Sequence, residues 1–350
     1  MPAPLLSPPA RRPVAVASLA LAALLAGCSS TSTSTSTSTT AGTTVSSTTP
    51  GSTASPSAPT SPTSVAGTVV PGATSGRPPL TPAADQAPPV GLNGIVYDHD
   101  RLWIADYKGA QLLGVDPASG AIVSRYTTAN GLSSAPDDLA VAADGTIYWT
   151  GFDSGDIGRV RFDAAGKPTF DVVGNIGAGA NPISIAEDGA IYAGRAVTGD
   201  GLFQIDPSGA TPPRQIVATV GNVNAFDVAP NGRIYGPRYG PQKTGALVRI
   251  NPGDGAIEEV TPGLSLPFAV KVSADGSSAF VAESGPPAQI TRIDLMTGTA
   301  TAFGKVDATL LDNLALGPDG TVFVTLFNGP KIAVLAPDGS TRTTLTVGRA

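Results

Sequence analysis

The chain has 350 residues, a formal net charge of −6 and a single cysteine. Phosphate binding requires a concentrated lysine and arginine surface, and no such patch is visible in the sequence, so we expect no nucleic-acid partner. One cysteine excludes an intramolecular disulfide. The composition separates a leading part without core-forming residues from one long folded part, which predicts a single folded domain.

Residues 1–27 have the order of an export signal. Arg11 and Arg12 precede the apolar run 14–25, and Ala26, Gly27 and Cys28 follow at once. A transmembrane helix needs about 20 apolar residues, so this run is too short to stay in a membrane. We therefore predict that the segment is removed.

Leu25-Ala26-Gly27-Cys28 resembles the bacterial lipobox. The resemblance implies that the thiol of Cys28 receives a diacylglyceryl group and that cleavage makes Cys28 the new N-terminus. The protein would then be exported and anchored to the outer face of the cell membrane. The alternatives are ordinary signal cleavage beside Ala26 or an incidental cysteine.

Residues 28–88 are rich in Ser, Thr and Pro, with almost no aromatic or long aliphatic side chains. Such a segment cannot bury a core, and we predict a disordered tether. A flexible chain of this length has an end-to-end distance of about 40 Å. The tether would hold the folded domain away from a membrane or a cell-wall layer.

One turn signal recurs through residues 89–350. Aligning its copies on one position gives successive spacings of 45, 44, 43, 44 and 44 residues for Asp100, Gly145, Gly189, Gly232, Gly276 and Gly320. Asp-Gly and Asn-Gly supply the positive φ of tight hairpin turns, and a second turn follows later in each copy. Four short strands per unit of about 44 residues predict a propeller blade. We predict an all-β, six-bladed β-propeller of four-stranded antiparallel blades. Plain contact between the first and last blades is one way to close the ring, and the sequence does not decide how it closes.

Three phrases in this part resemble a known family of propellers. They are Leu92-Asn93-Gly94-Ile95-Val96-Tyr97, Pro136-Asp137-Asp138-Leu139-Ala140-Val141 and Asp312-Asn313-Leu314-Ala315-Leu316. The first two are similar to the gluconolactonase/strictosidine-synthase-like group, and the third to the related paraoxonases. NHL-type binding propellers share much of the same repeat, so the resemblance is to the superfamily of propellers.

Polar residues recur where the first strand of each blade begins beside the central channel. Five of these six positions are Asn or Asp: Asn93, Asp137, Asn181, Asn224 and Asp312, with Phe268 at the remaining one. Oxygen donors that converge on one axis suit a hard divalent cation such as calcium. The alternative is that Asn and Asp are common at strand starts because their side chains bond local backbone groups.

The family resemblance supports a metal site. Lactonase and paraoxonase propellers hold a catalytic metal with Asn, Asp and Glu at these strand starts, and Asp137, Asn181, Asn224 and Asp312 match by type and position. Asn93 stands where gluconolactonases have a glutamate. That difference leaves both the ligand charge and the catalytic base in doubt.

The loops between the second and third strands should rim the same end of the channel. We predict that Arg195, Arg238, Tyr239 and Glu283 bind ligand there, beside Asp106, Tyr107, Lys108, Asp153 and Phe327. Arg195 and Arg238 could face a carboxylate. His99, the single histidine, falls in a turn at the opposite end, so a Ser-His mechanism has no proton acceptor.

Three functions are consistent with these features. The first is an exported, monomeric binding propeller for a small molecule or a cell-envelope component, with any cation structural. The second is a metal-dependent lactonase or esterase, in which the cation polarises the ester carbonyl and Asp137 or Asp312 is the base. The third is a scaffold within an envelope complex.

Overall fold

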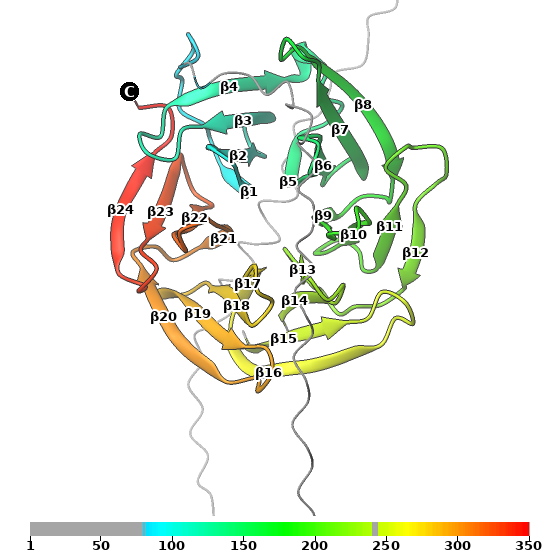
Figure 1. Cartoon of the computed structure of the whole chain (residues 1–350), viewed down its shortest axis with the longest axis vertical. Coiled ribbons are helices and arrows are strands. Elements are labelled where there is room, and N and C mark those ends of the chain that lie inside the picture. Colours follow the sequence, from blue (N-terminus) through cyan, green and yellow to red (C-terminus); the bar gives the residue numbers. More distant parts are fainter. Residues whose placement is uncertain (1–79, 81, 240–243, 350) are drawn as a thin grey trace, which may run out of the picture. The chain divides into compact units, whose positions relative to one another are not determined.

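The computed structural model describes residues 80, 82–239 and 244–349. Its 24 strands form six four-stranded antiparallel sheets arranged as a ring, which confirms the predicted six-bladed propeller (Figure 1). Within this part of the chain the helical structure is one 3-10 turn, η1 (Thr128–Asn130), and no helix is long and apolar enough to cross a membrane. The predicted signal peptide, Cys28 and most of the predicted tether lie outside the described residues.

Every blade uses four consecutive strands, in sequence order from the channel outward. The strands, blade by blade, are β1 (Leu92–Asp98), β2 (Arg101–Asp106), β3 (Gln111–Val115), β4 (Ile122–Thr127); β5 (Pro136–Val141), β6 (Ile147–Gly151), β7 (Asp156–Phe162), β8 (Pro168–Asn175); β9 (Ala180–Ile185), β10 (Ile191–Arg195), β11 (Leu202–Ile205), β12 (Arg214–Val217); β13 (Asp227–Val228), β14 (Ile234–Tyr239), β15 (Thr244–Ile250), β16 (Ile257–Ser265); β17 (Pro267–Val272), β18 (Ser278–Glu283), β19 (Ala288–Asp294), β20 (Ala300–Val306); β21 (Leu311–Leu316), β22 (Val322–Leu326), β23 (Lys331–Leu335), β24 (Thr341–Thr346).

The repeated Asp-Gly turn forms as its sequence predicts. In the second blade Gly145 has φ of 83°, its N–H donates to the carbonyl of Ala142 at 2.8 Å, and the Asp144 carboxylate accepts the N–H of Thr146 at 2.9 Å. Glycine adopts this left-handed conformation without steric cost. Blades two to six leave five residues between the first and second strands, whereas the first blade leaves only two, His99 and Asp100.

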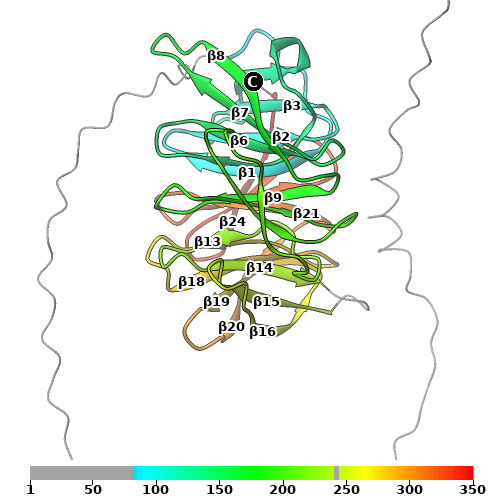
Figure 2. The same ribbon diagram turned by 90° about the vertical axis from the view of Figure 1, so that its right-hand side faces the viewer.

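The core lies between neighbouring blades. Between the first and second blades, Trp103 stacks on Phe162 with ring centroids 5.9 Å apart, and Trp149 packs in the same cluster. A Cβ atom at Gly158 would lie 2.0 Å from the Trp149 ring, so the close approach requires glycine at that position. Figure 2 shows the ring from the side, with strands of the first two blades at the top of the view and those of the fourth and fifth blades at the bottom.

Hydroxyl groups on second strands bond the first strand of the next blade. The Thr150 hydroxyl donates to the carbonyl of Asn181 at 2.6 Å and accepts the N–H of Asp138 at 3.1 Å. The same arrangement closes the ring, where the Thr325 hydroxyl donates to the carbonyl of Asn93 at 2.7 Å. First and last blades therefore meet by direct contact of β1 with β21 and β22.

Both ends of the described chain are held on the first blade. Upstream of the predicted boundary at residue 89, Ala83 donates its N–H to the carbonyl of Ile122 at 2.7 Å, and the Gln86 amide oxygen accepts the Ile122 N–H at 3.0 Å. Near the C-terminus, Gly348 donates its N–H to the carbonyl of Gly120 at 3.0 Å. Contacts of the propeller thus begin a few residues earlier than the sequence predicted.

Replacing Thr325 with Val tests the bond that closes the ring. The valine keeps the volume but leaves the buried carbonyl of Asn93 and the N–H of Asn313 without their hydroxyl partner. We expect the free energy of unfolding to fall by about 1–3 kcal/mol, measured by urea denaturation. The matched control is Thr343→Val on the exposed face of β24, which should change little. Equal effects of the two substitutions would contradict the role given to Thr325.

Candidate functional site: an oxygen-lined axial channel

The first strand of most blades is irregular where it begins. Register shifts interrupt the pairing of first and second strands at Leu92/Ile95, Pro136/Leu139, Pro267/Ala269 and Leu311/Leu314. A bulge bends the strand and re-aims its side chains, so two consecutive residues can turn toward the channel. Leu92 pairs with Asp106, which places the strand starts on the same face as the loops between second and third strands. We call this the loop face, and the opposite one the turn face.

The upper tier of the channel consists of the predicted strand-start residues. The Asn93 amide donates to Asp137 Oδ1 at 2.8 Å, joining the first and second blades. Asp137 is 3% exposed, and Asn181 and Asn224 are also buried. Asp312 is half-buried and lies close enough to raise the pKa of Asp137. The structure therefore gathers Asn93, Asp137 and Asp312 at the loop face, with Asn181 and Asn224 at the equivalent starts of the third and fourth blades.

A second tier, which the sequence analysis missed, lies directly behind the first. Asp138 and Asn313 join the second and sixth blades, which flank the first blade, since the Asn313 amide donates to Asp138 Oδ1 at 2.9 Å. Asp138 Oδ2 also accepts the N–H of Ile183 at 3.2 Å. The Asp-Asp and Asp-Asn pairs are visible in the sequence, but a regular strand would have turned their second members away from the channel.

A third tier contains a lysine beside the carboxylates of the channel. Lys271 Nζ lies 3.4 Å from Asp227 Oδ1, and the Ser184 hydroxyl donates to the same oxygen at 3.0 Å. The N–H of Val272 donates to Asp227 Oδ2 at 2.9 Å. The Lys271 charge opposes the effect of burial on the pKa of Asp138. The channel thus carries carboxylates along its length and an ammonium group toward the turn face.

Burial and mutual repulsion disfavour ionisation of the channel carboxyls. Burial is the main cause that raises the pKa of Asp137 well above its usual value, and Asp312 and Asp138 add repulsion. Burial, then repulsion from Asp138, raises the pKa of Asp312 to about 8. Burial raises the pKa of Asp138 to about 6, against the lowering effects of Lys271 and two backbone N–H groups. These groups would gain from a cation that offsets their charge.

Two buried oxygens of the upper tier have no hydrogen-bond partner among the residues that the structure describes. They are Asp137 Oδ2 and Asn224 Oδ1, on different blades. Buried polar atoms are normally bonded, so an orphaned pair of acceptors suggests a missing electropositive partner. In the described part of the chain no group of three or more His, Cys, Asp and Glu side chains could hold a metal. A cation here would consequently depend on the amide oxygens as well as the carboxylates.

Two contacts line the loop-face mouth of the channel. The Tyr107 hydroxyl donates to Asp153 Oδ2 at 3.0 Å, and burial together with this bond raises the pKa of Tyr107. Lys108 Nζ lies 4.4 Å from the centre of the Phe327 ring, a cation–π contact. The Lys108 charge also lowers the pKa of Asp312 against burial. These side chains belong to the first, second and sixth blades.

The four predicted ligand-binding residues do not converge. Arg195 Nε donates to the carbonyl of Ala178 at 3.0 Å, and Arg238 pairs with Glu259 at 2.7 Å. Tyr239 is buried and stacks on Phe268 with ring centroids 5.6 Å apart.

Glu283 and Asp106, both expected at the rim, are buried and bonded instead. Glu283 accepts the backbone N–H of Ser265 at 2.5 Å and bonds from Gln289 and Thr291. Asp106 accepts the N–H of Gly91 at 2.8 Å. Each is the last residue of the second strand of its blade, where its carboxylate accepts a hydrogen bond from a nearby backbone N–H group.

The fold and the channel define a six-bladed propeller with oxygen donors gathered on its axis. A model of the SMP-30/gluconolactonase/LRE-like region matches residues 92–350, and the chain belongs to this family. The predicted resemblance is thereby confirmed. A comparison with curated protein sequences finds no significant match.

Several solved structures are similar to this chain in fold. A streptogramin B lyase is 16% identical with a TM-score of 0.55, covering 76% of this chain and 85% of its own. Virginiamycin B lyase from Staphylococcus aureus is 16% identical with a TM-score of 0.54, covering 77% and 89%. A protein described as a gluconolactonase is 14% identical with a TM-score of 0.54, covering 77% and 98%. Likeness at these identities concerns the fold alone.

Replacing Asp312 with Asn tests the raised pKa of this half-buried carboxyl directly. An acid whose pKa rises on folding takes up a proton as the chain folds, so the free energy of unfolding falls as pH rises between the two pKa values. For Asp312 this range runs from about 4 in the unfolded chain to about 8 in the folded one. With chelator present, we expect the melting temperature of the variant, relative to the natural chain, to rise across this range.

The matched control for this measurement is Thr343→Val, on the exposed face of β24. This substitution changes no ionisable group, so its melting temperature should keep a constant offset from that of the natural chain between pH 4 and 8. A constant offset for Asp312→Asn as well would contradict the raised pKa.

Proposed function

We propose that this protein is an exported, lipid-anchored propeller that binds a small-molecule or cell-envelope ligand at the loop face, with a divalent cation, calcium, on the channel axis. The main observation in favour of the cation is that two buried oxygens, Asp137 Oδ2 and Asn224 Oδ1, have no hydrogen-bond partner among the described residues. The raised pKa values of Asp137 and Asp312 support it, because a cation would relieve their repulsion.

The residues proposed to hold the cation are Asn93, Asp137, Asn181, Asn224 and Asp312. Calcium accepts six to eight oxygen ligands from carboxylates, amides and water, which fits two carboxylates and three amides. When bound, such a cation polarises a carbonyl oxygen of a ligand. Asn93 contributes a further effect of its own, since its amide fixes Asp137 Oδ1 and leaves Oδ2 for the cation.

The mouth residues favour a polar ligand. Lys108 presents an ammonium group beside the axis, and the Tyr107–Asp153 pair presents a hydrogen-bonding edge on the neighbouring blade. A ligand carbonyl or carboxylate could meet Lys108 while reaching the axial carboxylates. Arg238, Tyr239 and Glu283 already contact other residues of the protein. In this proposal they stabilise the blades and do not bind the ligand.

A metal-dependent lactonase or esterase is the second candidate. Family membership favours it. Burial raises the pKa of both Asp137 and Asp312, and a bound cation would oppose this rise, so that one of the two could ionise and accept a proton from water. In this version Asp137 or Asp312 is the base. Hydrolysis of aliphatic or aromatic lactones that disappears in Asp137→Asn and Asp312→Asn would favour the enzyme over the binding module.

A lyase is not proposed. One similar structure is named as a catalytically inactive histidine-to-alanine variant of virginiamycin B lyase with quinupristin. This chain has one histidine, His99, and it lies in the hairpin of the first blade at the turn face, at the other end of β1 from the upper tier.

Calcium should raise the melting temperature of the full chain. A ligand at 100 times its dissociation constant stabilises the folded state by about 2.7 kcal/mol, which for a domain of this size is roughly 5 to 10 °C. Differential scanning calorimetry in chelator and in calcium measures the shift. We expect Asp137→Asn to reduce it, because the substitution removes charge from the orphaned ligand.

The control for the calcium shift is Asp254→Asn, which lies on an exposed turn and should leave it intact. The axial cation is disproved if calcium and chelator give the natural chain the same melting temperature. A calcium shift that survives in Asp137→Asn would place the ion elsewhere.

The anchor is proposed on Cys28, which follows the apolar run of the export-type signal. Substituting Cys28 with Ala removes the thiol that would carry the lipid, so we expect the protein to leave the membrane fraction and to incorporate no labelled fatty acid. Ser29→Ala is the matched control and should stay in the membrane fraction. Lipid labelling of the Cys28→Ala protein would contradict the anchor.

A further inference from the structure

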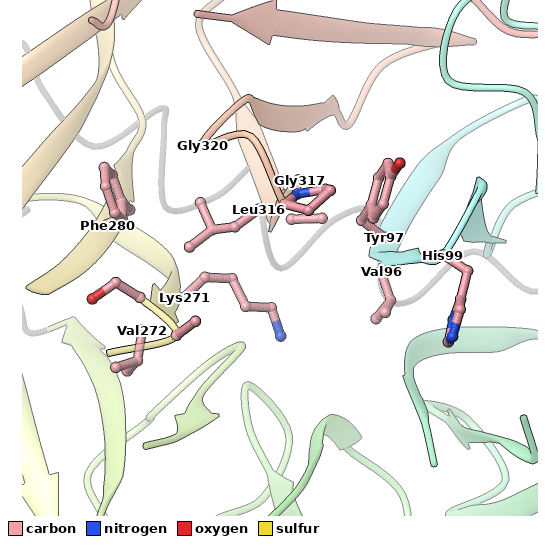
Figure 3. Close-up of a pocket in the computed structure, with 13 residues that line it drawn as sticks. Val96, Tyr97, His99, Lys271, Val272, Phe280, Leu316, Gly317 and Gly320 are labelled. Carbon is pink, nitrogen blue, oxygen red and sulfur yellow. The ribbon is translucent and has the colours of Figure 1, made fainter. Parts of the chain in front are cut away.

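A cavity opens on the turn face, at the other end of the channel from the proposed cation. It has a volume of 730 Å³ and lies between the first, fifth and sixth blades. Its walls come from the ends of β1, β17 and β21 and from the hairpins that follow them. Figure 3 shows its lining side chains. Nothing in the loop-face site uses this cavity.

The unequal hairpins account for the hollow. The fifth and sixth blades carry five residues between their first and second strands, and these hairpins form two walls. The first blade has only His99 and Asp100 there, so its hairpin forms a shorter wall than the other two hairpins. His99 has φ of 56°, unusual for a residue other than glycine, and its ring Nδ1 lies 2.7 Å from Asp98 Oδ1.

The lining is apolar except for a small number of polar groups. Val96, Phe280 and Leu316 supply apolar walls, and Lys271 extends its ammonium group from β17 toward Val96 across the open space (Figure 3). His99 stands at the far rim. None of the described residues that line the cavity is acidic. An apolar pocket with one fixed charge matches the usual design of small-molecule sites.

The ammonium group of Lys271 can accept another partner. It has three N–H donors, and its contact with Asp227 is long at 3.4 Å. Asp227 also receives the Ser184 hydroxyl and the Val272 N–H, so Lys271 is not its sole donor. The Lys271 side chain is only 18% exposed, which strengthens a charged hydrogen bond made there.

We propose that this turn-face cavity binds a small amphipathic carboxylate. The carboxylate accepts hydrogen bonds from Lys271 Nζ, and the aromatic or aliphatic body lies against Val96, Phe280 and Leu316. The site is separate from the loop-face site, and it requires no metal. A neutral ligand of the same shape would bury the same apolar surface but would lack the charged bond.

Isothermal titration calorimetry of the full chain tests the proposal with 4-phenylbutyrate and its neutral analogue 4-phenylbutyramide. A charged hydrogen bond contributes enough that the acid should bind at least about tenfold more tightly than the amide. Lys271→Met should abolish this preference, and Lys271→Arg should retain it. Leu316→Trp, which fills the cavity without changing charge, should weaken both probes.

Lys331→Met, an exposed lysine on β23, is the matched control and should leave the preference unchanged. Binding of 4-phenylbutyrate should be the same in calcium and in chelator, which separates this site from the proposed axial cation. Equal affinity for acid and amide, no binding of either probe at millimolar concentration, or a preference that persists in Lys271→Met would each overturn the proposal. Binding that requires calcium would assign the probe to the loop face and would overturn it too.

Discussion

Closure of the ring is the constraint on which the rest of this structure depends. Six sheets can meet in a ring only if their first strands converge on one axis, and convergence removes water from whatever side chains those strands carry there. In this chain they carry carboxyl and amide groups. Asp137 and Asp138 are almost completely buried as a result, and burial is the largest cause of their raised pKa values.

Hydrogen bonds between blades offset part of the cost of burying these polar groups. Thr150 and Thr325 each bridge a first strand to the next blade, and the Asn313 amide on the sixth blade bonds Asp138 on the second. Two buried oxygens, Asp137 Oδ2 and Asn224 Oδ1, still have no hydrogen-bond partner among the described residues. The oxygens that the protein does not satisfy itself are the ones we assign to a cation.

The two ends of the channel differ in charge and in shape. Carboxylates and amides gather at the loop face, whereas Lys271 belongs both to the channel and to the apolar cavity at the turn face. Through Asp138, Lys271 is electrostatically linked to the carboxylates above it. One lysine therefore offsets buried negative charge and offers a bond to a ligand from the other side.

The sequence predicted the features that repeat and missed those that break the repeat. Gly145 and its equivalents marked the hairpins of blades two to six because a positive φ leaves a strong signal in one residue. The strand-start position of Asp137 followed from the same spacing.

Asp138 and Asn313 could not be predicted, since only a bulge turns the second residue of each pair inward. Glu283 was expected at the rim but is buried, because its partners Gln289 and Thr291 lie on the adjacent strand. The turn-face cavity depends on the different lengths of three hairpins that are far apart in the sequence, so no local sequence pattern predicts it.

The central claim is that a cation occupies the upper tier. Long-wavelength anomalous diffraction from crystals grown with calcium tests it most directly, because the method locates the ion itself. The account predicts one strong anomalous peak on the axis, about 2.3–2.6 Å from both Asp137 Oδ2 and Asn224 Oδ1. Absence of a peak there, or peaks confined to the outer surface of the blades, would contradict it.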